Sequence, residues 1–560
     1  MEKLTLLSPR FMQKTFLILF FCAAIFLQIH KIHRNEMWFD EIETDLYSYK
    51  TLTSLSHWLG LDTQVLLMKK VLSDSHSPGY GLLVYLYSAL FGGGENIRYL
   101  SVVSSALSLW LLYLCAVRIV KKQEAVFAVA LLAYSPLILW YSQEARGYSL
   151  FLALGLTQTL FLLRSLQEKS FQPWVGYALM GGINLLFEPT LLIMSGAFGL
   201  IYYLYKDWER LRIWGVITAV LIVEFFVFTI FLKSYFLFVR QSLSWVPFPT
   251  IQSLFATCIS FNLGYSATFL QHVVAVLLFL PLFLWGAVTF LRERTKTSIV
   301  VVLCLLIPIG GIFLLSRLGW YFYLERRMII VLPFYFIILA KAVFRLKPVL
   351  IRRMIQICIF FLMGISIGNY FNGYVSLDIA GNPCFTGIHK KKDYRMLFDA
   401  FLPQGDIPVF AADLQAWKLL YAYYRPWERP QFNEKIHGLI FCPSVLLEHE
   451  RVYILRESRA DFPLDNQLYV AELNARFARG PVMMVGQFNR SIGMFGTGDS
   501  DSAFTLVSAA WDSTLSENAE YVRKYLDDSY DRTFSFVQEG MRFDSYQRKN
   551  VSRGSLECSR

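Results

Sequence analysis

The sequence predicts an α-helical polytopic membrane protein of about eleven transmembrane helices, followed by a small C-terminal α/β extracytoplasmic domain. Three observations lead to this fold class. The 560 residues are 55% hydrophobic and 16% aromatic, a composition that soluble domains rarely have. Apolar runs close to membrane-spanning length recur as far as residue 371. Basic residues gather in alternate connections between these runs, as they do where they set membrane topology.

The apolar runs define the predicted spans in chain order. They lie at roughly 13–30, 98–117, 123–141, 148–164, 174–189, 190–205, 213–232, 271–291, 298–315, 328–344 and 354–371. Five prolines fall in or beside these runs: Pro136, Pro189, Pro281, Pro308 and Pro333. Proline removes a backbone donor and clashes with the preceding turn, so we expect kinks or breaks at these positions.

The basic residues also orient the chain. With the N-terminus in the cytoplasm, every inside connection carries lysine or arginine, and these connections are 118–122, 164–169, 206–212, 292–296 and 345–353. An odd number of spans then places the residues from about 372 outside the membrane. We therefore expect a multi-pass protein of the cell inner (plasma) membrane, with a cytoplasmic N-terminus and an extracytoplasmic C-terminal domain.

This orientation gives two domains, 1–371 in the membrane and 372–560 outside it. Four outer segments then gather unusual polar and aromatic residues on one membrane face. They are the long first loop 31–97, the turn 142–147, the loop 233–270 and the segment 316–327.

The C-terminal region has short apolar segments separated by frequent turns. Residues 407–412, 452–455, 481–488 and 532–540 are predicted strands, and residues 413–424 and 517–528 are predicted helices. Such alternation favours a small α/β domain. We expect the tail from about residue 545 to be disordered.

The eight cysteines show no metal-ligand spacing. Five of them lie in or beside apolar runs, and we interpret these as small core residues: Cys22, Cys115, Cys258, Cys304 and Cys358. If the C-terminal region is extracytoplasmic, one disulfide can form there, and Cys384–Cys442 is the pair that we name first. The formal charge of +11 would suit a nucleic-acid partner. The basic residues lie between apolar runs, however, and no nucleic-acid motif is present, so we expect no such partner.

Asp40 and Glu41 follow the first apolar run at once and open the long first loop. Carboxylates at a membrane face are costly and are usually retained for a function. One interpretation is a general base that takes a proton from an acceptor hydroxyl. The alternative is a pair of solvated loop acids that mark the end of a span.

Four further candidate residues lie on the predicted outer face. His76 opens a His-Ser-Pro-Gly turn before an aromatic helix at the membrane surface, where it could touch substrate or bind a metal, although a lone histidine more often does neither. Arg146 could hold a phosphate by two parallel hydrogen bonds, oriented by Glu144, and Tyr148 of the same turn is a further binding candidate. An internal Glu–Arg pair that closes the turn is the alternative.

The remaining candidates lie at span ends. Glu188 is an acid at the outer end of the fifth span, where it could bind substrate or cap the helix that breaks at Pro189. Arg326 and Arg327 precede the tenth span and could neutralise a lipid phosphate or pyrophosphate. Arginines that snorkel to lipid headgroups are the alternative.

Together these fragments resemble the multispanning glycosyltransferases of the C-type (GT-C) fold, in particular the bacterial family 39 branch related to protein O-mannosyltransferases, and more distantly the lipid A aminoarabinose transferases. The matching fragments are 38–41, 75–92, 97–103, 135–150, 244–249 and 326–340, in the family's order. The resemblance covers about residues 13–371, and 403–424 resembles the family's strand-helix segment after the last span.

The resemblance implies specific roles. Asp40, with Glu41 beside it, corresponds to the family's catalytic base, and Arg146 with the Arg326-Arg327 pair are candidates for the donor phosphate. His76 stands in the family's His-x-Pro-Pro motif, here with Gly79 in place of the second proline. Glu188-Pro189 stands where the family often has His-Pro.

The predicted function is therefore an inverting transfer of a sugar from a polyprenyl-phosphate donor to an acceptor hydroxyl on the outer face. The acceptor is a lipid, a glycan or a protein. Membrane lipids are the other expected partners. No cofactor is expected to be required, and a divalent metal near Asp40 is an option that no residue cluster demands. The alternatives are a lipid or sugar transporter or flippase, a non-catalytic envelope assembly factor, and a ligase that moves whole glycans from lipid pyrophosphate.

Overall fold

The computed structural model describes residues 9–34, 37, 39–53, 62–65, 67, 77–231, 248–320, 322–376 and 379, and five strands between 409 and 548. Contacts along the chain divide it into two compact units. The first comprises residues 1–34 and 43–390, and the second comprises residues 35–42 and 391–560. The last long helix, α18 (Val349–Phe371), ends at the predicted boundary, whereas the contacts place the division at 390/391 and assign residues 35–42 to the second unit, so the two predicted domains stay a prediction.

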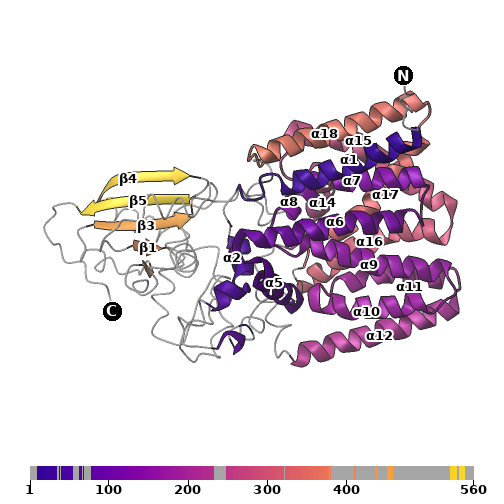
Figure 1. The fold of residues 1–560 in the computed structure, drawn as a ribbon, viewed down its shortest axis with the longest axis horizontal. Coiled ribbons are helices and arrows are strands. Elements are labelled where there is room, and N and C mark those ends of the chain that lie inside the picture. The colour runs from indigo at the N-terminus through magenta and orange to yellow at the C-terminus, as the bar shows by residue number, and fades with distance from the viewer. Residues whose placement is uncertain are drawn as a thin grey trace, which may run out of the picture. The chain divides into compact units, whose positions relative to one another are not determined.

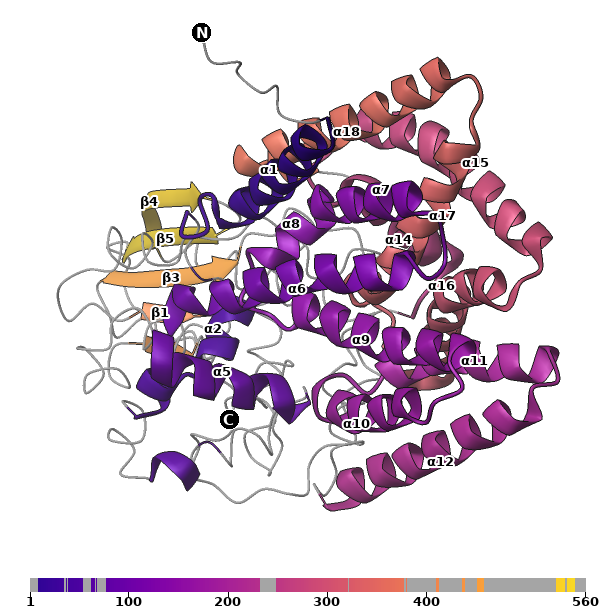
Figure 2. The same cartoon turned by 45° about the vertical axis from the view of Figure 1, so that its right-hand side comes forward.

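The first unit is a bundle of helices (Figures 1 and 2). In chain order its helices are α1 (Pro9–Ile29), α5 (Pro78–Phe91), α6 (Arg98–Ala116), α7 (Lys122–Ala133), α8 (Pro136–Ser142), α9 (Tyr148–Gln167), α10 (Gln172–Phe187), α11 (Leu191–Leu204), α12 (Trp208–Phe231), α14 (Ile251–Leu263), α15 (Phe269–Glu293), α16 (Lys296–Leu315), α17 (Leu332–Arg345) and α18. Three short turns complete it: η1 (Gly94–Ile97), the π-turn η2 (Ser316–Trp320) and the 3₁₀ turn η3 (Glu325–Val331). Helix α17 packs against α7, α15, α16 and α18, and its residues from Leu332 to Val343 are all buried, so it forms the centre of the bundle.

Helices break at three of the five prolines and continue through the other two. Helices α7 and α8 are bent by 54° at the break before Pro136, where the Ser135 hydroxyl accepts a hydrogen bond from the amide of Ile138 and caps α8. Pro189 separates α10 from α11, and Pro333 lies in the first turn of α17, where its missing donor costs nothing. Pro281 and Pro308 instead lie inside α15 and α16, which continue through them.

Each predicted span overlaps a helix of the bundle. In the part of the chain that the structure describes, six helices are long and apolar enough to cross a membrane, or seven if the bent pair α7–α8 is one span. The other helices do not meet both the length and the composition criteria over their described residues, so the total of eleven stays a prediction. Helix α14, within the segment 233–270 that we predicted to be a loop, is an addition.

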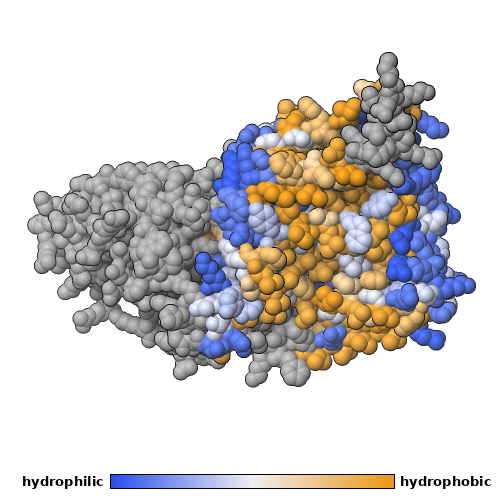
Figure 3. Space-filling model, in the orientation of Figure 1, coloured by the Kyte–Doolittle hydropathy of each residue, from blue (hydrophilic) through white to orange (hydrophobic). Residues whose placement is uncertain are grey.

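Polar residues lie at the two ends of the bundle, with an apolar band between them (Figure 3). The predicted inner connections contact one another at one end. For example, the side-chain amide of Gln167, the last residue of α9, donates to the carbonyl oxygen of Arg118, after α6. The predicted outer segments contact one another at the other end, where the Tyr265 carbonyl oxygen accepts from the amide of Ser376. Both contacts agree with the alternation of ends that the basic residues predict, and the membrane topology of the chain stays a prediction.

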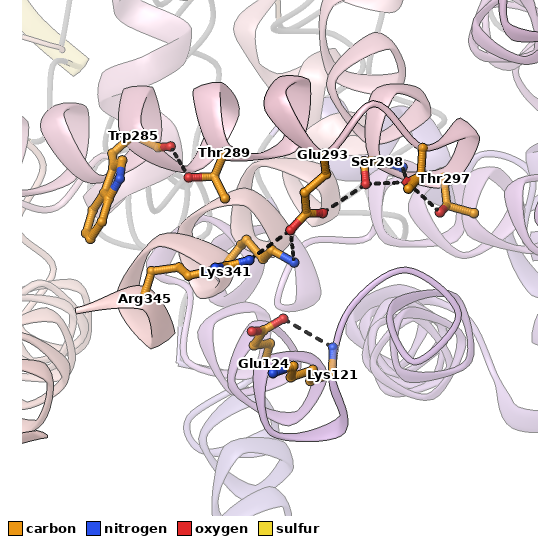
Figure 4. A network of polar contacts seen from close by, with 10 residues as sticks. Lys121, Glu124, Trp285, Thr289, Glu293, Thr297, Ser298, Lys341 and Arg345 are labelled. Carbon is orange, nitrogen blue, oxygen red and sulfur yellow. Dashed lines mark hydrogen bonds and ion pairs between the residues drawn. The ribbon is translucent and has the colours of Figure 1, made fainter. Parts of the chain in front are cut away.

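One carboxylate ties together three helix ends at the predicted inner face (Figure 4). Glu293, the last residue of α15, pairs with Lys341 at 2.8 Å and with Arg345 at 3.0 Å, both from α17. Its other oxygen accepts from the Ser298 hydroxyl at 3.0 Å, at the start of α16. Lys341 is only 8% exposed, so this pair is partly withdrawn from solvent and fixes the relative positions of the helices.

A second carboxylate, that of Asp207 in the turn between α11 and α12, pairs with residues of α12 and α16. It pairs with Arg210 and with Lys296, each at 2.7 Å. Partial burial acts to raise the pKa of Asp207, but the hydrogen bonds and charges of Lys296 and Arg210 outweigh it, so the pKa is lowered from its ordinary value.

The described residues of the second unit include one five-stranded sheet. Its strands are β1 (Val409–Ala411), β2 (Ile436–Gly438), β3 (Arg451–Glu457), β4 (Tyr530–Gln538) and β5 (Met541–Arg548), in the order β2-β1-β3-β5-β4. β1 pairs in parallel with β2 and β3, whereas β3–β5 and β5–β4 are antiparallel. The predicted strands at 407–412, 452–455 and 532–540 overlap β1, β3 and β4. The helices predicted at 413–424 and 517–528 and the strand at 481–488 lie outside the described residues, so the α/β class stays a prediction.

Two predictions were wrong. Cys115 and Cys304 are buried, but Cys22, Cys258 and Cys358 are exposed, because they lie on helix faces that point away from the bundle rather than into its core. The predicted start of disorder at about residue 545 is too early in the chain, because β5 continues to Arg548 in an antiparallel pair with β4. Cys384 and Cys442 lie outside the described residues.

Candidate functional site

The acids after the first span lie in α2 (Phe39–Asp45), a short helix. Asp40 and Glu41 occupy its first turn, where carboxylates interact favourably with the positive end of the helix dipole. Asp40 is half-buried, and Glu41 is 0% exposed. Glu41 is therefore not the solvated loop acid of our alternative interpretation. Thr44 follows Asp40 by one helical turn and shares its face of α2.

The end of α1, which leads toward α2, is held by two buried side chains of other helices. The Nε2 atom of Gln143, after α8, lies 3.2, 3.0 and 2.8 Å from three carbonyl oxygens between Leu27 and His30. The last carbonyls of a helix have no partner within it, so Gln143 caps α1 from outside. Nη1 of Arg98, which is 1% exposed, donates to the carbonyl oxygen of Ile32 at 2.7 Å.

The turn 142–147 packs onto the start of α6 and onto α2. The Ser101 hydroxyl donates to the carbonyl oxygens of Glu144 at 2.7 Å and Arg146 at 3.2 Å. Nη1 of Arg146 donates to the Thr44 hydroxyl at 3.4 Å. Glu144 is 3% exposed, whereas Arg146 is half-buried. The turn therefore places the Arg146 guanidinium at the end of α2.

A second guanidinium lies beside this turn. Arg326, in η3, has its Cζ atom 5.9 Å from the ring centroid of Tyr148, a cation–π arrangement, and is 5% exposed. The Tyr148 ring contacts the Tyr141 ring at a centroid distance of 4.7 Å. A buried guanidinium does not snorkel to headgroups, so the alternative interpretation of Arg326 is wrong.

Behind Arg326 lies a chain of buried polar side chains. The hydroxyls of Tyr141 and Tyr265 are 2.9 Å apart, and the Tyr265 hydroxyl donates to Oε1 of Glu325 at 3.3 Å. All three residues are 1% exposed. Burial, and next the charge of Glu325, raise the pKa of the Tyr265 hydroxyl well above its ordinary value. Tyr265 therefore keeps its proton and acts as a donor.

The structure brings some predicted site residues together and leaves others apart. Glu144, Arg146, Tyr148 and Arg326 gather around the turn between α8 and α9. Arg327 lies instead over the Phe322 ring, at 5.9 Å, and so does not act beside Arg326 as a simple pair. The Thr190 hydroxyl donates to the Glu188 carboxylate at 2.6 Å in the turn between α10 and α11, a contact of the capping kind. His76 lies outside the described residues.

Sequence reasoning missed several residues of this region: Arg98, Gln143, Tyr265 and Glu325. A signal existed for Gln143 and Glu325, because each is a polar residue adjacent to a predicted site residue. Tyr265 carried none, since one tyrosine in an aromatic-rich chain has no pattern to distinguish it. Among the described residues, no three His, Cys, Asp or Glu side chains are grouped so as to hold a metal ion. The metal requirement stays a prediction.

Comparison with known proteins gives one family match and several similar structures. The family model of the dolichyl-phosphate-mannose-protein mannosyltransferases matches residues 75–235. No curated protein sequence matches the chain closely enough to be called a relative. ArnT from Cupriavidus metallidurans in the apo state is similar in structure, with a TM-score of 0.50 and 12% identity over 79% of this chain and 93% of ArnT.

Two further solved structures are similar. ArnT bound to undecaprenyl phosphate gives a TM-score of 0.49 and 11% identity over 79% of this chain and 93% of that one. The oligosaccharyltransferase AglB from Archaeoglobus fulgidus was solved in complex with an inhibitory peptide and a dolichol-phosphate. It gives a TM-score of 0.41 and 11% identity over 83% of this chain and 71% of AglB. At such identities the likeness to apo ArnT establishes the fold. The chain is thus a multi-pass membrane protein with the C-type (GT-C) glycosyltransferase fold that its sequence fragments indicate.

Proposed function

We propose that this chain is a membrane glycosyltransferase that moves a sugar from a polyprenyl-phosphate donor to an acceptor hydroxyl on the outer membrane face, with Asp40 as general base. The fold shared with ArnT and the family match over 75–235 support the reaction class. ArnT itself has been solved bound to undecaprenyl phosphate. The family that the model describes is named for a sugar carried on dolichyl phosphate.

The observation that carries the proposal is the pair of guanidinium groups beside one turn. Arg146 reaches α2 through Thr44, and Arg326 lies over the ring of Tyr148, two residues further along the same turn. Guanidinium groups bind phosphate oxygens by parallel hydrogen bonds and keep their charge at any physiological pH. Within a partly water-excluded site, they stabilise the charge that develops on a departing phosphate.

A single displacement accounts for the reaction. Asp40 takes the proton of the acceptor hydroxyl, and that oxygen attacks the anomeric carbon from the face opposite the phosphate. The bond from the anomeric carbon to the phosphate oxygen breaks, its electron pair stays on the phosphate, and the configuration inverts. Arg146 and Arg326 stabilise the leaving polyprenyl phosphate, so no acid is needed. This differs from glycoside hydrolysis, where two carboxylates flank the bond.

The geometry around α1 and α2 supports Asp40 as the base. Its carboxylate is half-buried in the first turn of α2, so it combines access to substrate with partial protection from water. Gln143 and Arg98 hold the end of α1 and the residues just after it, up to Ile32. The carboxylate of Glu41 is fully buried, which suits support of the helix better than a direct proton transfer.

The remaining assignments are part of the same proposal. His76, Glu144, Tyr148, Glu188 and Arg327 contribute to the binding of donor or acceptor. The protein lies in the inner membrane with its N-terminus in the cytoplasm and its C-terminal domain outside, where it meets a lipid, glycan or protein acceptor. The sugar is a hexose or a pentose, and no metal is required.

Mass spectrometry of envelope glycans and lipid-linked sugars tests this function. The strains to compare carry the wild-type chain, a deletion, Asp40→Asn, or the control Asp62→Asn, another isosteric change of an outer-loop acid. Asp62 is exposed and accepts from the amide of Gln64 at 2.8 Å, a bond that asparagine also makes.

We expect the deletion and Asp40→Asn to lose one sugar from one glycan and to accumulate the corresponding polyprenyl-phosphate sugar, while Asp62→Asn behaves as wild type. Full transfer by Asp40→Asn at normal protein level would refute the assignment of the base. If only the deletion changes the glycan, the protein acts in transport or assembly. Accumulation of a whole glycan on lipid pyrophosphate would instead identify a ligase.

A further inference from the structure

We propose that a cluster of cations at the predicted inner ends of α15 and α17 binds the head group of an anionic phospholipid, whose acyl chains lie along α18. The inner basic cluster, as we call it, consists of six residues from the connections 292–296 and 345–353: Arg292, Arg294, Arg345, Lys347, Arg352 and Arg353. The proposal does not depend on the transfer reaction, because η3 and α17 separate Arg326, at the proposed phosphate site, from the cluster.

The starting observation is that charge is unevenly distributed among the predicted inner connections. The connections 292–296 and 345–353 together carry seven lysines and arginines and one acid, Glu293. The connections 164–169 and 206–212 carry five such cations and three acids. The orientation of spans depends on lysine and arginine, and acids contribute little to it. Topology therefore does not explain why one pair of connections lacks the acids that the other pair has.

Ion pairs and a ring contact bring the two connections of the cluster together. Nη2 of Arg345 lies 3.0 Å from Oε1 of Glu293, and Nζ of Lys341 lies 2.8 Å from the same oxygen (Figure 4). The Cζ atom of Arg352, in the first turn of α18, lies 5.2 Å from the ring centroid of Phe344 in α17. The ends of α15 and α17 and the start of α18 therefore meet, and the cations of both connections lie on neighbouring turns.

The one acid does not neutralise the cluster. Glu293 is shared between Lys341 and Arg345. Within the part of the chain that the structure describes, no carboxylate lies within ion-pair distance of the other five cations: Arg292, Arg294, Lys347, Arg352 and Arg353. Four of these are exposed, and Arg352 is half-buried. Like charges held close together repel one another, so an anion that binds among them lowers the electrostatic free energy of the cluster.

An exposed apolar stripe on α18 begins beside these cations. Four large apolar residues, at spacings of four, three and four, share one face of the helix: Leu350, Met354, Ile357 and Phe361. Each of them is between 56% and 68% exposed. Arg353 follows Leu350 by three residues and so lies next to the stripe. Cations at the membrane surface followed by an apolar face within the membrane match the two parts of a phospholipid.

The charge of the cluster selects among the head groups that a membrane offers. A zwitterionic head group carries an ammonium group, which the surplus cations repel, whereas an anionic head group gains from each cation near it. A soluble phosphate would have to be concentrated from water. A lipid is already confined to the bilayer beside α18, which acts as a high effective concentration. The cluster therefore fits an anionic phospholipid better than either alternative.

The experiment is native mass spectrometry of the purified full-length chain in detergent, titrated with dioleoylphosphatidylglycerol or with the zwitterionic dioleoylphosphatidylcholine. The cluster variant is Arg294→Gln/Lys347→Gln/Arg353→Gln. All three side chains are exposed, so their replacement leaves the interior of the bundle unchanged. Thermal unfolding without added lipid checks that the variant is folded.

The matched control is Lys169→Gln/Lys206→Gln/Arg212→Gln. It removes three exposed cations from the connections 164–169 and 206–212, so it changes the charge of the protein by the same amount as the cluster variant. Any general effect of net charge on the binding of an anionic lipid is then equal in the two variants.

We expect the cluster variant to lose roughly tenfold or more in affinity for phosphatidylglycerol, while the control stays within about threefold of wild type. Binding of phosphatidylcholine should be the same in all three proteins. An equal loss in both triple variants would show a general charge effect and overturn the proposal. Wild-type affinity of the cluster variant for phosphatidylglycerol, or an equal loss of both lipids, would also overturn it.

Competition with sn-glycerol 3-phosphate separates a lipid site from a site for soluble phosphate. This compound carries a phosphate on glycerol but has no acyl chains, and we expect it to bind roughly a hundredfold more weakly than phosphatidylglycerol or worse. If it displaces the lipid at equal concentration, the assignment to a phospholipid falls. Sugar transfer is not measured in these assays, so failure of the proposed function would leave their outcome unchanged.

Discussion

Replacing Gln143 with leucine tests whether the end of α1 is held in position by the turn after α8. Gln143 is 5% exposed, its Nε2 faces three carbonyl oxygens of residues 27–30, and its Oε1 accepts from the Tyr370 hydroxyl at 2.9 Å. An amide nitrogen carries two protons, so two donated bonds and one accepted bond are lost. Leucine is similar in size, so the change removes hydrogen bonds without opening a large cavity.

The hydrogen bonds of Gln143 set the expected loss of stability in Gln143→Leu. Hydrogen bonds between helices in membrane proteins contribute about 0.6 kcal/mol each on average, and those in soluble proteins about 1 kcal/mol. Three bonds, together with the carbonyl oxygens left without donors, give a loss of about 2–3 kcal/mol in the free energy of unfolding. The effect on transfer should be larger than stability alone explains. A displacement of about 1 Å of a catalytic group costs up to roughly a hundredfold in rate, and Gln143 lies in the same turn as Arg146, the proposed phosphate ligand.

The control is Gln158→Leu. Gln158 is 1% exposed, donates to the carbonyl oxygen of Leu191 at 3.1 Å and accepts from the side chain of Asn184, in the interior of the bundle. Both variants should unfold at lower temperature in detergent. At a temperature where both are folded, kcat for sugar transfer should fall roughly tenfold or more for Gln143→Leu and less than about threefold for Gln158→Leu. Equal activities for the two variants would refute the positioning role of Gln143.

Three other predictions follow from the ion pairs, the basic residues and the chemistry. The pKa of Asp207 is lowered in the folded protein, so its stabilising contribution is complete above the unfolded value near 3.8 and is lost as the pH falls through the folded pKa. Wild type should therefore lose more stability than Asp207→Asn between pH 5 and pH 3. Parallel curves of stability against pH for the two proteins would contradict this. In intact cells, a membrane-impermeant maleimide should label Asp62→Cys more than the wild-type chain with its native cysteines, whereas Lys122→Cys should be labelled no more than wild type. The reverse pattern would invert our topology. Transfer should persist in EDTA, and loss of activity that added Mg²⁺ or Mn²⁺ restores would show a metal requirement.

Much of the bundle could be predicted because a membrane-spanning helix has a recognisable length and composition in the sequence. A helix in lipid must satisfy its backbone internally and cover it with apolar side chains, so its length and composition are constrained residue by residue. The break at Pro136 was predictable for the same local reason. The exposure of Cys22, Cys258 and Cys358 was not, because an apolar run in a membrane protein is hydrophobic on the lipid side as well as inside. Helix α14 was missed because a 13-residue apolar segment is too short to be recognised as a span.

The candidate site was predictable only in part. Arg146 and Arg326 stood out because charged residues are rare beside apolar runs. Their neighbours did not, because the contacts join segments far apart in the chain. Gln143 reaches carbonyls more than a hundred residues earlier, and Tyr265 meets both Tyr141 and Glu325. Such contacts depend on how helices pack, which no local pattern encodes. Arg326 and Arg327 look equivalent in sequence, yet one is buried over Tyr148 and the other lies over Phe322.

The most direct test of the central claim is the release of polyprenyl phosphate during transfer. Purified protein in liposomes would receive the lipid-linked sugars and acceptor fraction extracted from deletion cells, and mass spectrometry would quantify both products. The account predicts one free polyprenyl phosphate for each sugar transferred by wild type and by Asp62→Asn, and neither product with Asp40→Asn. Release of polyprenyl pyrophosphate, or passage of the lipid-linked sugar across the bilayer with no new glycosidic bond, would contradict it.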